Sequence, residues 1–459
     1  MFLSETVNSS GREISALTPR SCGGPPGKWL CQWLWVAALP ALLSIVAYGW
    51  AITLPFIGDD YLQITLGRQY GPPASWTALI ADPLYRCRAT SIVLTRLTEQ
   101  WVGIQPFWYN ITSIVLHIVN AWMVLCLGIW RRIGWRVSSA AACFFAIYEG
   151  HQEAVVWYSA LPELLVVFFV LACVLFWILR YEFPGRAGLW YAASLAAFVF
   201  ALASKESGVA AVGLLALVGF RENEGWRRGL KLLAPFVSLA LLYFVANYAG
   251  RSQNQHYSDG TFSLSAPFWT TLPRSLARMI WVWGLVSLTA MSVWRSRSRI
   301  PLVATAACWM VVSLSPYSFL TYMPVVPSRH TYLAGVGLSL IVSAGFLTLR
   351  ERPGCRRTVV AGVALLVLLH NFSYLWIRKQ RQYNERAEPT ELLVENLRDR
   401  QGRVEVYCFP YGSNTADLAV TLRIGSQVQP LVAPMGRPAK PVDGAVDLCG
   451  TALAHEAMR

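Results

Sequence analysis

Two adjacent carboxylates, Asp59 and Asp60, directly follow a long apolar run from Trp29 to Pro55. A charge close to membrane hydrocarbon costs several kcal/mol, so such a pair is expected where a site uses it. One carboxylate could serve as a general base toward a hydroxyl group, and the other could orient it or bind a cation. Taken alone, the pair also fits a solvated turn after the apolar run.

A second acidic cluster follows further along the chain. His151 and Glu153 are separated by one residue, a weak metal-binding pattern without further ligands. Glu163 follows Pro162, where the first turn of a helix favours negative charge. These three side chains could orient an acceptor or hold a divalent cation. A polar loop in which His151 caps the neighbouring helix would explain the same residues.

The candidate anion-binding groups are basic residues beside apolar runs. Lys205 interrupts two such runs together with Glu206, and Arg329 stands at the expected start of another. Arginine can bind a phosphate through two hydrogen bonds, so we expect Arg86, Lys205 and Arg329 to contact a lipid phosphate. Arg88 is a further candidate. The alternatives are an internal ion pair at a tight turn and an arginine that extends to the membrane interface.

Composition places these groups in a membrane protein. The chain has 459 residues, of which 55% are hydrophobic and 14% charged, and its mean hydropathy is +0.42. This is typical of a polytopic membrane protein. The net charge of +14 comes from basic residues grouped in short clusters between apolar runs, which indicates membrane topology and not a nucleic-acid partner.

We expect an all-α polytopic protein with about eleven transmembrane helices in residues 28–377, after a disordered cytoplasmic segment, 1–27. The expected spans are the run 29–55 and the segments 106–130, 137–149, 162–180, 189–204, 207–220, 232–249, 273–294, 300–318, 331–349 and 358–377. His117 and Asn120 lie one turn apart in one span, where we expect them to make interhelical hydrogen bonds.

The loops between these spans alternate in charge. One set is short and rich in arginine, and the positive-inside rule assigns it to the cytoplasm with the N-terminus. The other set then faces outward, including the loop 56–105 with the acidic pair and an expected surface helix over Thr90–Trp101. A site on the outer face excludes direct use of cytoplasmic nucleotide-sugars or ATP.

The C-terminal region, 378–459, differs in composition. Residues Arg403–Phe409 alternate like a strand, and Thr415–Ile424 could form a helix or a strand. We expect a small α/β extracytoplasmic appendix. Cys408 and Cys449 could pair there if the compartment is oxidising.

The order of motifs resembles the GT-C membrane glycosyltransferases. Within that family it looks similar to the protein O-mannosyltransferase-like proteins that carry transmembrane and tetratricopeptide regions (dolichyl-phosphate-mannose-protein mannosyltransferase-like) and to their bacterial relatives. The matching segments are Phe56–Tyr61, Tyr85–Arg86, Pro106–Ala121, His151–Trp157 with Glu163–Leu165, Ser204–Gly208 and Arg329–Leu333. The family's tetratricopeptide tail does not occur in this chain.

The resemblance implies a fold of 11 spans with an active site on the outer face. The donor would be a polyprenyl-phosphate-linked sugar, and transfer to a hydroxyl-bearing acceptor would invert the anomeric centre. Asp59 would be the base with Asp60 as its neighbour, and Arg329 and Lys205 would contact the donor phosphate. The missing tail favours a bacterial inner membrane location.

Two other functions fit a many-span chain. A flippase or transporter for lipid-linked saccharides is expected to carry inverted repeats and broken spans, and the sequence has no clear repeat. A non-catalytic membrane scaffold would depend on the C-terminal region. In that case deletion of 378–459, but not Asp59→Asn, would abolish function.

Overall fold

A computed structural model of the chain describes residues 26–253, 262–263, 265–321, 323–351, 357–433 and 444–451. The expected disordered segment, 1–27, lies outside the described residues except for its last two positions.

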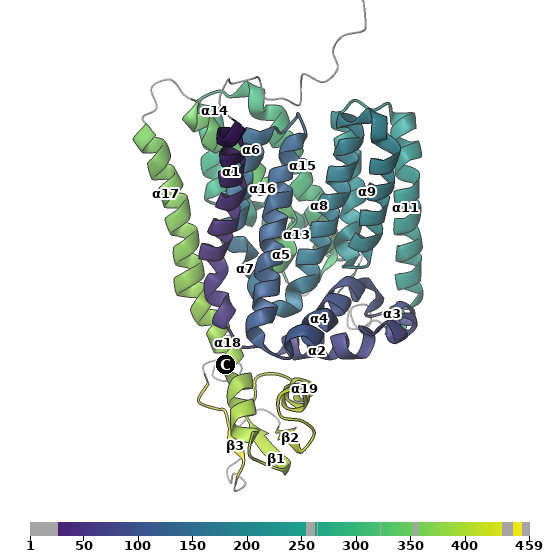
Figure 1. Cartoon of the computed structure of the whole chain (residues 1–459), viewed down its shortest axis with the longest axis vertical. Coiled ribbons are helices and arrows are strands. Elements are labelled where there is room, and N and C mark those ends of the chain that lie inside the picture. Colours follow the sequence, from purple (N-terminus) through teal and green to yellow (C-terminus); the bar gives the residue numbers. More distant parts are fainter. Residues whose placement is uncertain are drawn as a thin grey trace, which may run out of the picture.

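The body of the molecule is a helical bundle (Figure 1), which confirms the expected all-α membrane architecture. Its long elements are α1 (Pro26–Tyr48), α5 (Pro106–Cys126), α6 (Trp135–Ile147), α8 (Leu161–Glu182), α9 (Ala187–Leu202), α10 (Ala210–Arg221), α11 (Trp226–Ala249), α13 (Phe268–Ile280), α14 (Trp283–Val293), α15 (Ile300–Leu314), α16 (Ala334–Arg350) and α17 (Arg357–Ser373). Each expected span coincides with one of these helices or with the α13–α14 pair.

Helix length alone supports fewer crossings than the sequence predicts. Within the described residues, seven helices are long and apolar enough to cross a membrane, or eight if α13 and α14, bent by 75° between them, count as one. The remaining predicted spans correspond to α6, α10 and α16, which are shorter.

Small residues allow α16 to sit at the centre of the bundle. A Cβ atom on Gly337 would lie 2.5 Å from the carbonyl oxygen of Ala306, and one on Gly345 would lie 2.5 Å from Ser287 Cβ. Helices therefore approach α16 more closely than larger side chains would permit. By contrast, α11 and α17 are largely unburied and apolar, as lipid-facing helices are.

The polar residues inside the bundle pair between helices, as expected. His117 Nδ1 lies 2.7 Å from Tyr332 Oη, and Asn120 Nδ2 donates to the carbonyl oxygen of Leu164 at 3.0 Å. These contacts join α5 to α8 and to the segment before α16.

One end of the bundle carries three short helices between α1 and α5. They are α2 (Asp59–Tyr70), α3 (Trp76–Ala81) and α4 (Ala89–Val102), at the lower end in Figure 1. The helix α4 coincides with the expected surface helix. A second set of short elements, η5 (Glu149–His151), α7 (Gln152–Val156) and η6 (Tyr158–Ala160), joins α6 to α8.

The arginine-rich loops share the opposite end, where ion pairs connect them. Arg131 pairs with Glu182 at 2.8 Å, Arg180 with Glu224 at 3.0 Å, and Arg299 with Glu351 at 2.6 Å. Two of these pairs join a loop to the last turn of α8, and the third joins the segment before α15 to the one after α16. The arginine-rich loops therefore lie together at one end of the bundle.

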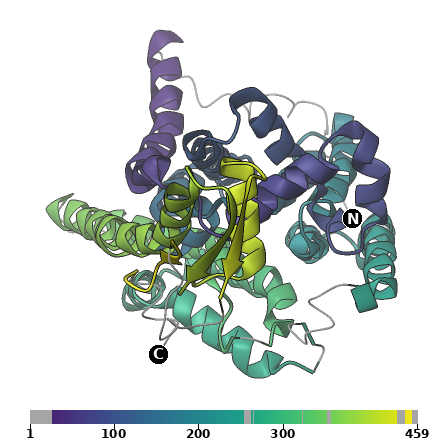
Figure 2. The same cartoon turned by 90° about the horizontal axis from the view of Figure 1, so that it is seen from below.

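The C-terminal region forms the predicted small α/β appendix (Figure 2). The π-helical turn Tyr374–Lys379 joins α17 to α18 (Gln380–Leu397), which enters the appendix. The strands β1 (Gly402–Tyr407), β2 (Val428–Val432) and β3 (Val446–Asp447) form a parallel sheet in the order β2-β1-β3. The segment with two possible structures is a helix, α19 (Ser413–Arg423).

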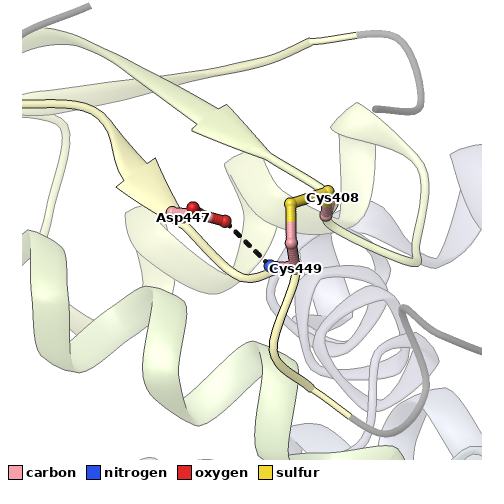
Figure 3. A group of neighbouring side chains, drawn as sticks. All are labelled: Cys408, Asp447 and Cys449. Carbon is pink, nitrogen blue, oxygen red and sulfur yellow. Dashed lines mark hydrogen bonds between the residues drawn. A yellow bond between two sulfur atoms is a disulfide. The ribbon is translucent and has the colours of Figure 1, made fainter. Parts of the chain in front are cut away.

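A disulfide joins Cys408 to Cys449 in the appendix, as the sequence suggested (Figure 3). Elsewhere the appendix packs on the loop that carries the acidic pair. The ring of Tyr411 lies against Gly58, and Val394 and Ala419 share an apolar cluster with Phe56. The appendix therefore covers part of the loop beside Asp59.

Candidate active site

A cavity of about 640 Å³ is lined by the acidic pair's segment, the start of α8, the turn between α9 and α10, and the segment before α16. The predicted site residues on its wall are Asp59, Glu163, Lys205 and Arg329. These four residues are spread over positions 59 to 329 of the sequence, and the fold brings them to one cavity.

The two carboxylates of the acidic pair have different surroundings. Asp60 is buried, and its two oxygens accept hydrogen bonds from the backbone N–H groups of Ile57 at 2.9 Å and Ser159 at 2.7 Å. Asp59 is exposed on the cavity and makes no hydrogen bond or ion pair with the described part of the chain. Asp60 thus connects the start of α2 to η6, while Asp59 stays available to a ligand.

Burial dominates the proton affinity of Asp60. Desolvation raises the pKa of this carboxyl to about 7, against the two backbone hydrogen bonds, which favour its ionised form. A group that titrates near neutral pH is thus held directly beside Asp59.

A buried hydrogen-bonded network forms the floor of the cavity around Glu163. Glu163 Oε1 contacts both Lys205 Nζ and His330 Nδ1, and its Oε2 lies 2.7 Å from Tyr317 Oη. Tyr317 Oη is also 2.6 Å from Ser207 Oγ. Glu163 is only 2% exposed, so its charge is compensated entirely within this network.

The network pairs one buried carboxylate with one lysine beside the cavity. Burial and the neighbouring Lys205 lower the pKa of His330 to about 4, so the imidazole is neutral near pH 7. Burial also lowers the pKa of Lys205, and the attraction of Glu163 opposes that effect. Lys205, in contact with Glu163, is the basic side chain that this network places on the cavity wall.

Arg329 is held at the cavity by Glu153. Its Nη1 lies 2.5 Å from Glu153 Oε1, and its backbone N–H donates to Oε2 at 3.2 Å. Burial would raise the pKa of Glu153, but Arg329 and these hydrogen bonds hold it below its usual value. Glu153 therefore positions a cavity cation and is not itself on the cavity wall.

The structure corrects the assignment of Arg86. Its Nη2 donates to the carbonyl oxygen of Ala246 at 2.8 Å, and the side chain does not line the cavity. Arg88 lines the cavity instead, and its Nε is buried without a hydrogen-bond partner in the described structure. Burial acts to lower the pKa of Arg88, but the combined effect of Glu206, Cys87, Glu163 and Tyr85 outweighs it and raises that pKa.

The structure also moves His151 away from the site. Its side chain is fully buried, its Nδ1 lies 3.0 Å from the carbonyl oxygen of Phe145, and its ring packs on Tyr332. A Cβ atom on Gly335 would lie 2.2 Å from His151 Nε2, so α16 closes over the ring. His151 is therefore a core residue and cannot orient an acceptor in the cavity.

Apolar side chains also line the cavity. They include Val209, Phe244, Phe262, Phe319 and Leu320. The cavity wall thus combines charged groups with aromatic and aliphatic groups.

No protein-family model and no curated protein matches this chain. Its fold is similar to that of ArnT from Cupriavidus metallidurans bound to undecaprenyl phosphate, with a TM-score of 0.52 and 12% identity over 88% of this chain and 86% of ArnT. The apo form of ArnT gives a TM-score of 0.51 and 13% identity, over 87% of this chain and 86% of ArnT. An Archaeoglobus fulgidus oligosaccharyltransferase tethered to an acceptor peptide gives 0.50 and 10% identity, over 89% of this chain and 65% of that chain. The chain has the GT-C fold.

Within this GT-C fold, two contributors to the cavity could not be assigned from the sequence. Tyr317 stands in an apolar run like any interfacial tyrosine, yet it bonds to Glu163. Trp157 lines the cavity, with the guanidinium carbons of Arg329 and Arg386 at 5.2 and 4.7 Å from its ring centre. Arg386 comes from α18, so the C-terminal helix reaches the cavity wall.

The one group of three potential metal ligands within the described residues lies outside the cavity. It comprises Cys408, Asp447 and Cys449. The sulfurs of the two cysteines are joined in the disulfide, and Asp447 accepts a hydrogen bond from the Cys449 N–H at 3.0 Å (Figure 3). The group therefore offers no thiolate to a metal. At the cavity, Glu163 is already compensated, so the carboxylates left on the wall to meet a divalent cation are Asp59 and Glu206.

Proposed function

We propose that this GT-C chain is a membrane glycosyltransferase that moves a sugar from a polyprenyl-phosphate-linked donor to a hydroxyl acceptor. The observation that carries the proposal is the composition of one cavity. Asp59, a carboxylate with no ion-pair partner among the described residues, shares the cavity wall with Arg88, Lys205 and apolar side chains. A base, anion ligands and a lipophilic wall are the groups that this reaction requires.

Asp59 is the proposed general base. It accepts the proton of the acceptor hydroxyl while that oxygen attacks the anomeric carbon. The bond from this carbon to the phosphate oxygen breaks, and polyprenyl phosphate leaves with the electron pair. Attack opposite the leaving group inverts the anomeric centre. Asp60 is the proposed positioning residue, because its carboxylate holds the loop before α2 against η6.

Arg88, Lys205 and Arg329 are the proposed ligands of the donor phosphate. Charge-assisted hydrogen bonds to a phosphate stabilise it more in the departing dianion than in the bound diester. The neutral imidazole of His330 adds no further charge. A divalent cation beside Asp59 could assist the same charge separation, and the proposed mechanism does not require it.

The apolar wall of the cavity suits a polyprenyl chain. Phe244, Phe319 and Leu320 offer the lipid apolar surface in the same cavity, and Phe244 is 46% exposed on the bundle. Undecaprenyl phosphate bound to ArnT supports this ligand class for the fold. The proposed acceptor carries its hydroxyl group on a protein, a lipid or an envelope glycan.

The proposed active face is extracytoplasmic. The disulfide of the appendix requires an oxidising compartment. The arginine-rich loops at the other end favour the cytoplasm by the positive-inside rule. The N-terminus then lies in the cytoplasm and the C-terminus outside, and a bacterial inner membrane is the proposed location.

The test is sugar transfer from radiolabelled polyprenyl-phosphate donors by membranes that contain the wild type or Asp59→Asn. Asp399→Asn is the matched control, because Asp399 is exposed in the turn after α18 and does not line the cavity. We expect label in an acceptor fraction with the wild type and the control, and a loss of at least about 100-fold in Asp59→Asn.

Other outcomes would support the two alternatives. No transfer from mannose, glucose, galactose or arabinose donors, together with movement of a labelled lipid-linked saccharide across vesicles, would support a flippase. The 75° bend between α13 and α14 is the feature that such a protein would use. Loss of cellular function on deletion of the appendix, but not in Asp59→Asn, would support a scaffold.

A further inference from the structure

A second cavity, of about 690 Å³, lies at the opposite end of the molecule from the candidate active site. It is formed by α14, α15 and the turn that joins them. None of its lining residues belongs to the candidate active site. The second cavity is therefore separate from the candidate active site.

Two helix faces supply the apolar side of this cavity, which forms a groove between them. On α14, Leu288, Met291 and Ser292 follow the spacing of one helix face. On α15, Ile300, Ala304 and Ala307 do the same and cover roughly 10 Å of helix length at 1.5 Å per residue. The two alanines leave space between the helices that larger side chains would fill.

The groove has a basic end. Arg295 and Arg297, in the turn between the helices, line it and are exposed. Within the described residues, neither guanidinium has an ion-pair partner. The neighbouring Arg299 differs, since it pairs with Glu351 at 2.6 Å.

The acidic residues of this end cannot compensate the two arginines, because each is already paired. Among the described residues these are Glu182, Glu222, Glu224 and Glu351, which pair with Arg131, Arg132, Arg180 and Arg299 respectively. The basic end of the groove therefore has a positive charge that no side chain described here neutralises. An anion from outside the chain would neutralise it.

We propose that this groove binds an anionic phospholipid. Its phosphodiester lies between Arg295 and Arg297, and one acyl chain lies between α14 and α15. The occupant is a lipid and not a soluble anion, because the charges continue into an apolar groove on helices of the membrane domain. The arginine-rich end faces the leaflet whose anionic lipids attract such residues. This site does not depend on the proposed glycosyl transfer.

The experiment measures lipid binding to the full-length protein in a neutral detergent by native mass spectrometry. The probes are phosphatidylglycerol and phosphatidylcholine with identical acyl chains, titrated separately. We expect the wild type to retain phosphatidylglycerol preferentially. Arg295→Gln with Arg297→Gln should weaken its binding about 30-fold, from the usual contribution of two arginines near an anionic surface.

Two further variants separate the site from general surface attraction. Arg186→Gln with Lys231→Gln removes two exposed cations of the same end that do not line the groove, and it should leave the affinity unchanged. Ala304→Trp fills the groove without changing its charge and should weaken binding as well.

Three results would overturn the proposal. The first is equal retention of both lipids by the wild type. The second is an equal loss of phosphatidylglycerol affinity in the double arginine variant of the groove and in its control. The third is unchanged phosphatidylglycerol binding in Ala304→Trp. Displacement of the lipid by millimolar inorganic phosphate would also overturn it, because that result assigns the arginines to a soluble anion.

Discussion

The carboxylates of Asp59 and Asp60 are adjacent in sequence, yet one is exposed on a cavity and the other is buried between two backbone N–H groups. The first turn of α2 directs the two side chains differently, so neighbouring residues of one type have separate tasks. Asp59 can reach a ligand, while Asp60 determines where the loop before α2 lies.

Asp60→Asn should therefore destabilise the protein, whereas Asp59→Asn should not. The asparagine amide can accept from one backbone N–H but leaves the other opposite an NH₂ group, at a cost of about 1–3 kcal/mol. Thermal unfolding of the purified variants checks this expectation. An unchanged midpoint for Asp60→Asn, or a fall of equal size for Asp59→Asn, would contradict the division of tasks.

The stability that Asp60 contributes should depend on pH. Its pKa is raised from 3.8 to about 7 in the folded protein, chiefly by burial, so the folded state holds its proton more tightly than the unfolded state. The contribution is then fully present below about pH 4 and is lost as the pH rises through about 7. The unfolding midpoint of the wild type, relative to that of Asp60→Asn, should fall over this interval. The opposite slope would mean that the two N–H groups outweigh burial.

Glu163→Gln should be among the most damaging single changes in the cavity. It leaves the ammonium of Lys205 buried without its counter-charge, a situation that typically costs about 3–5 kcal/mol. Tyr317→Phe is the matched control, because it removes one hydrogen bond to the same carboxylate and should cost about 1 kcal/mol. Adding Lys205→Met to Glu163→Gln should recover part of the loss. Equal losses of unfolding free energy in Glu163→Gln and Tyr317→Phe would show that the negative charge of Glu163 does not stabilise buried Lys205.

The disulfide of the appendix gives a prediction of both stability and location. Cys408 and Cys449 are 41 residues apart, and closing a loop of this length stabilises a fold by up to about 4 kcal/mol. Cys408→Ser should lower the unfolding midpoint of the appendix, whereas Cys308→Ser, at an exposed free cysteine, should not. In intact cells, a thiol reagent that cannot cross the inner membrane should label Cys408 and Cys449 only after reduction. Labelling without reduction would contradict both the bond and the compartment.

Hydropathy predicts the long helices of the bundle, because an apolar run in a membrane chain has few other stable conformations. The acidic pair is recognisable in the sequence because two charges lie directly beside an apolar run. The arginines were harder to assign: Arg86 and Arg88 lie two residues apart on one 3-10 turn, and only the rotation of that turn decides which faces the cavity. Sequence spacing does not report this rotation.

Contacts between distant segments account for the remaining differences. His151 belongs to a polar segment that resembles a loop, but η5 turns it into the core, where α16 closes over it. Arg386 lies in α18, far along the chain from Trp157, whose ring it contacts. No periodicity of either segment contains information about the other.

The final long helix sets the height of the appendix. The helical run Arg357–Leu397 has 41 residues, roughly 60 Å at 1.5 Å per residue, while the hydrocarbon core of a bilayer is about 30 Å thick. About half of this run must therefore project beyond the bilayer. Inserting one residue before Arg386 would lift the appendix by about 1.5 Å and turn it by about 100°. Both the distance and the orientation of the appendix over the cavity are thus fixed by a count of residues.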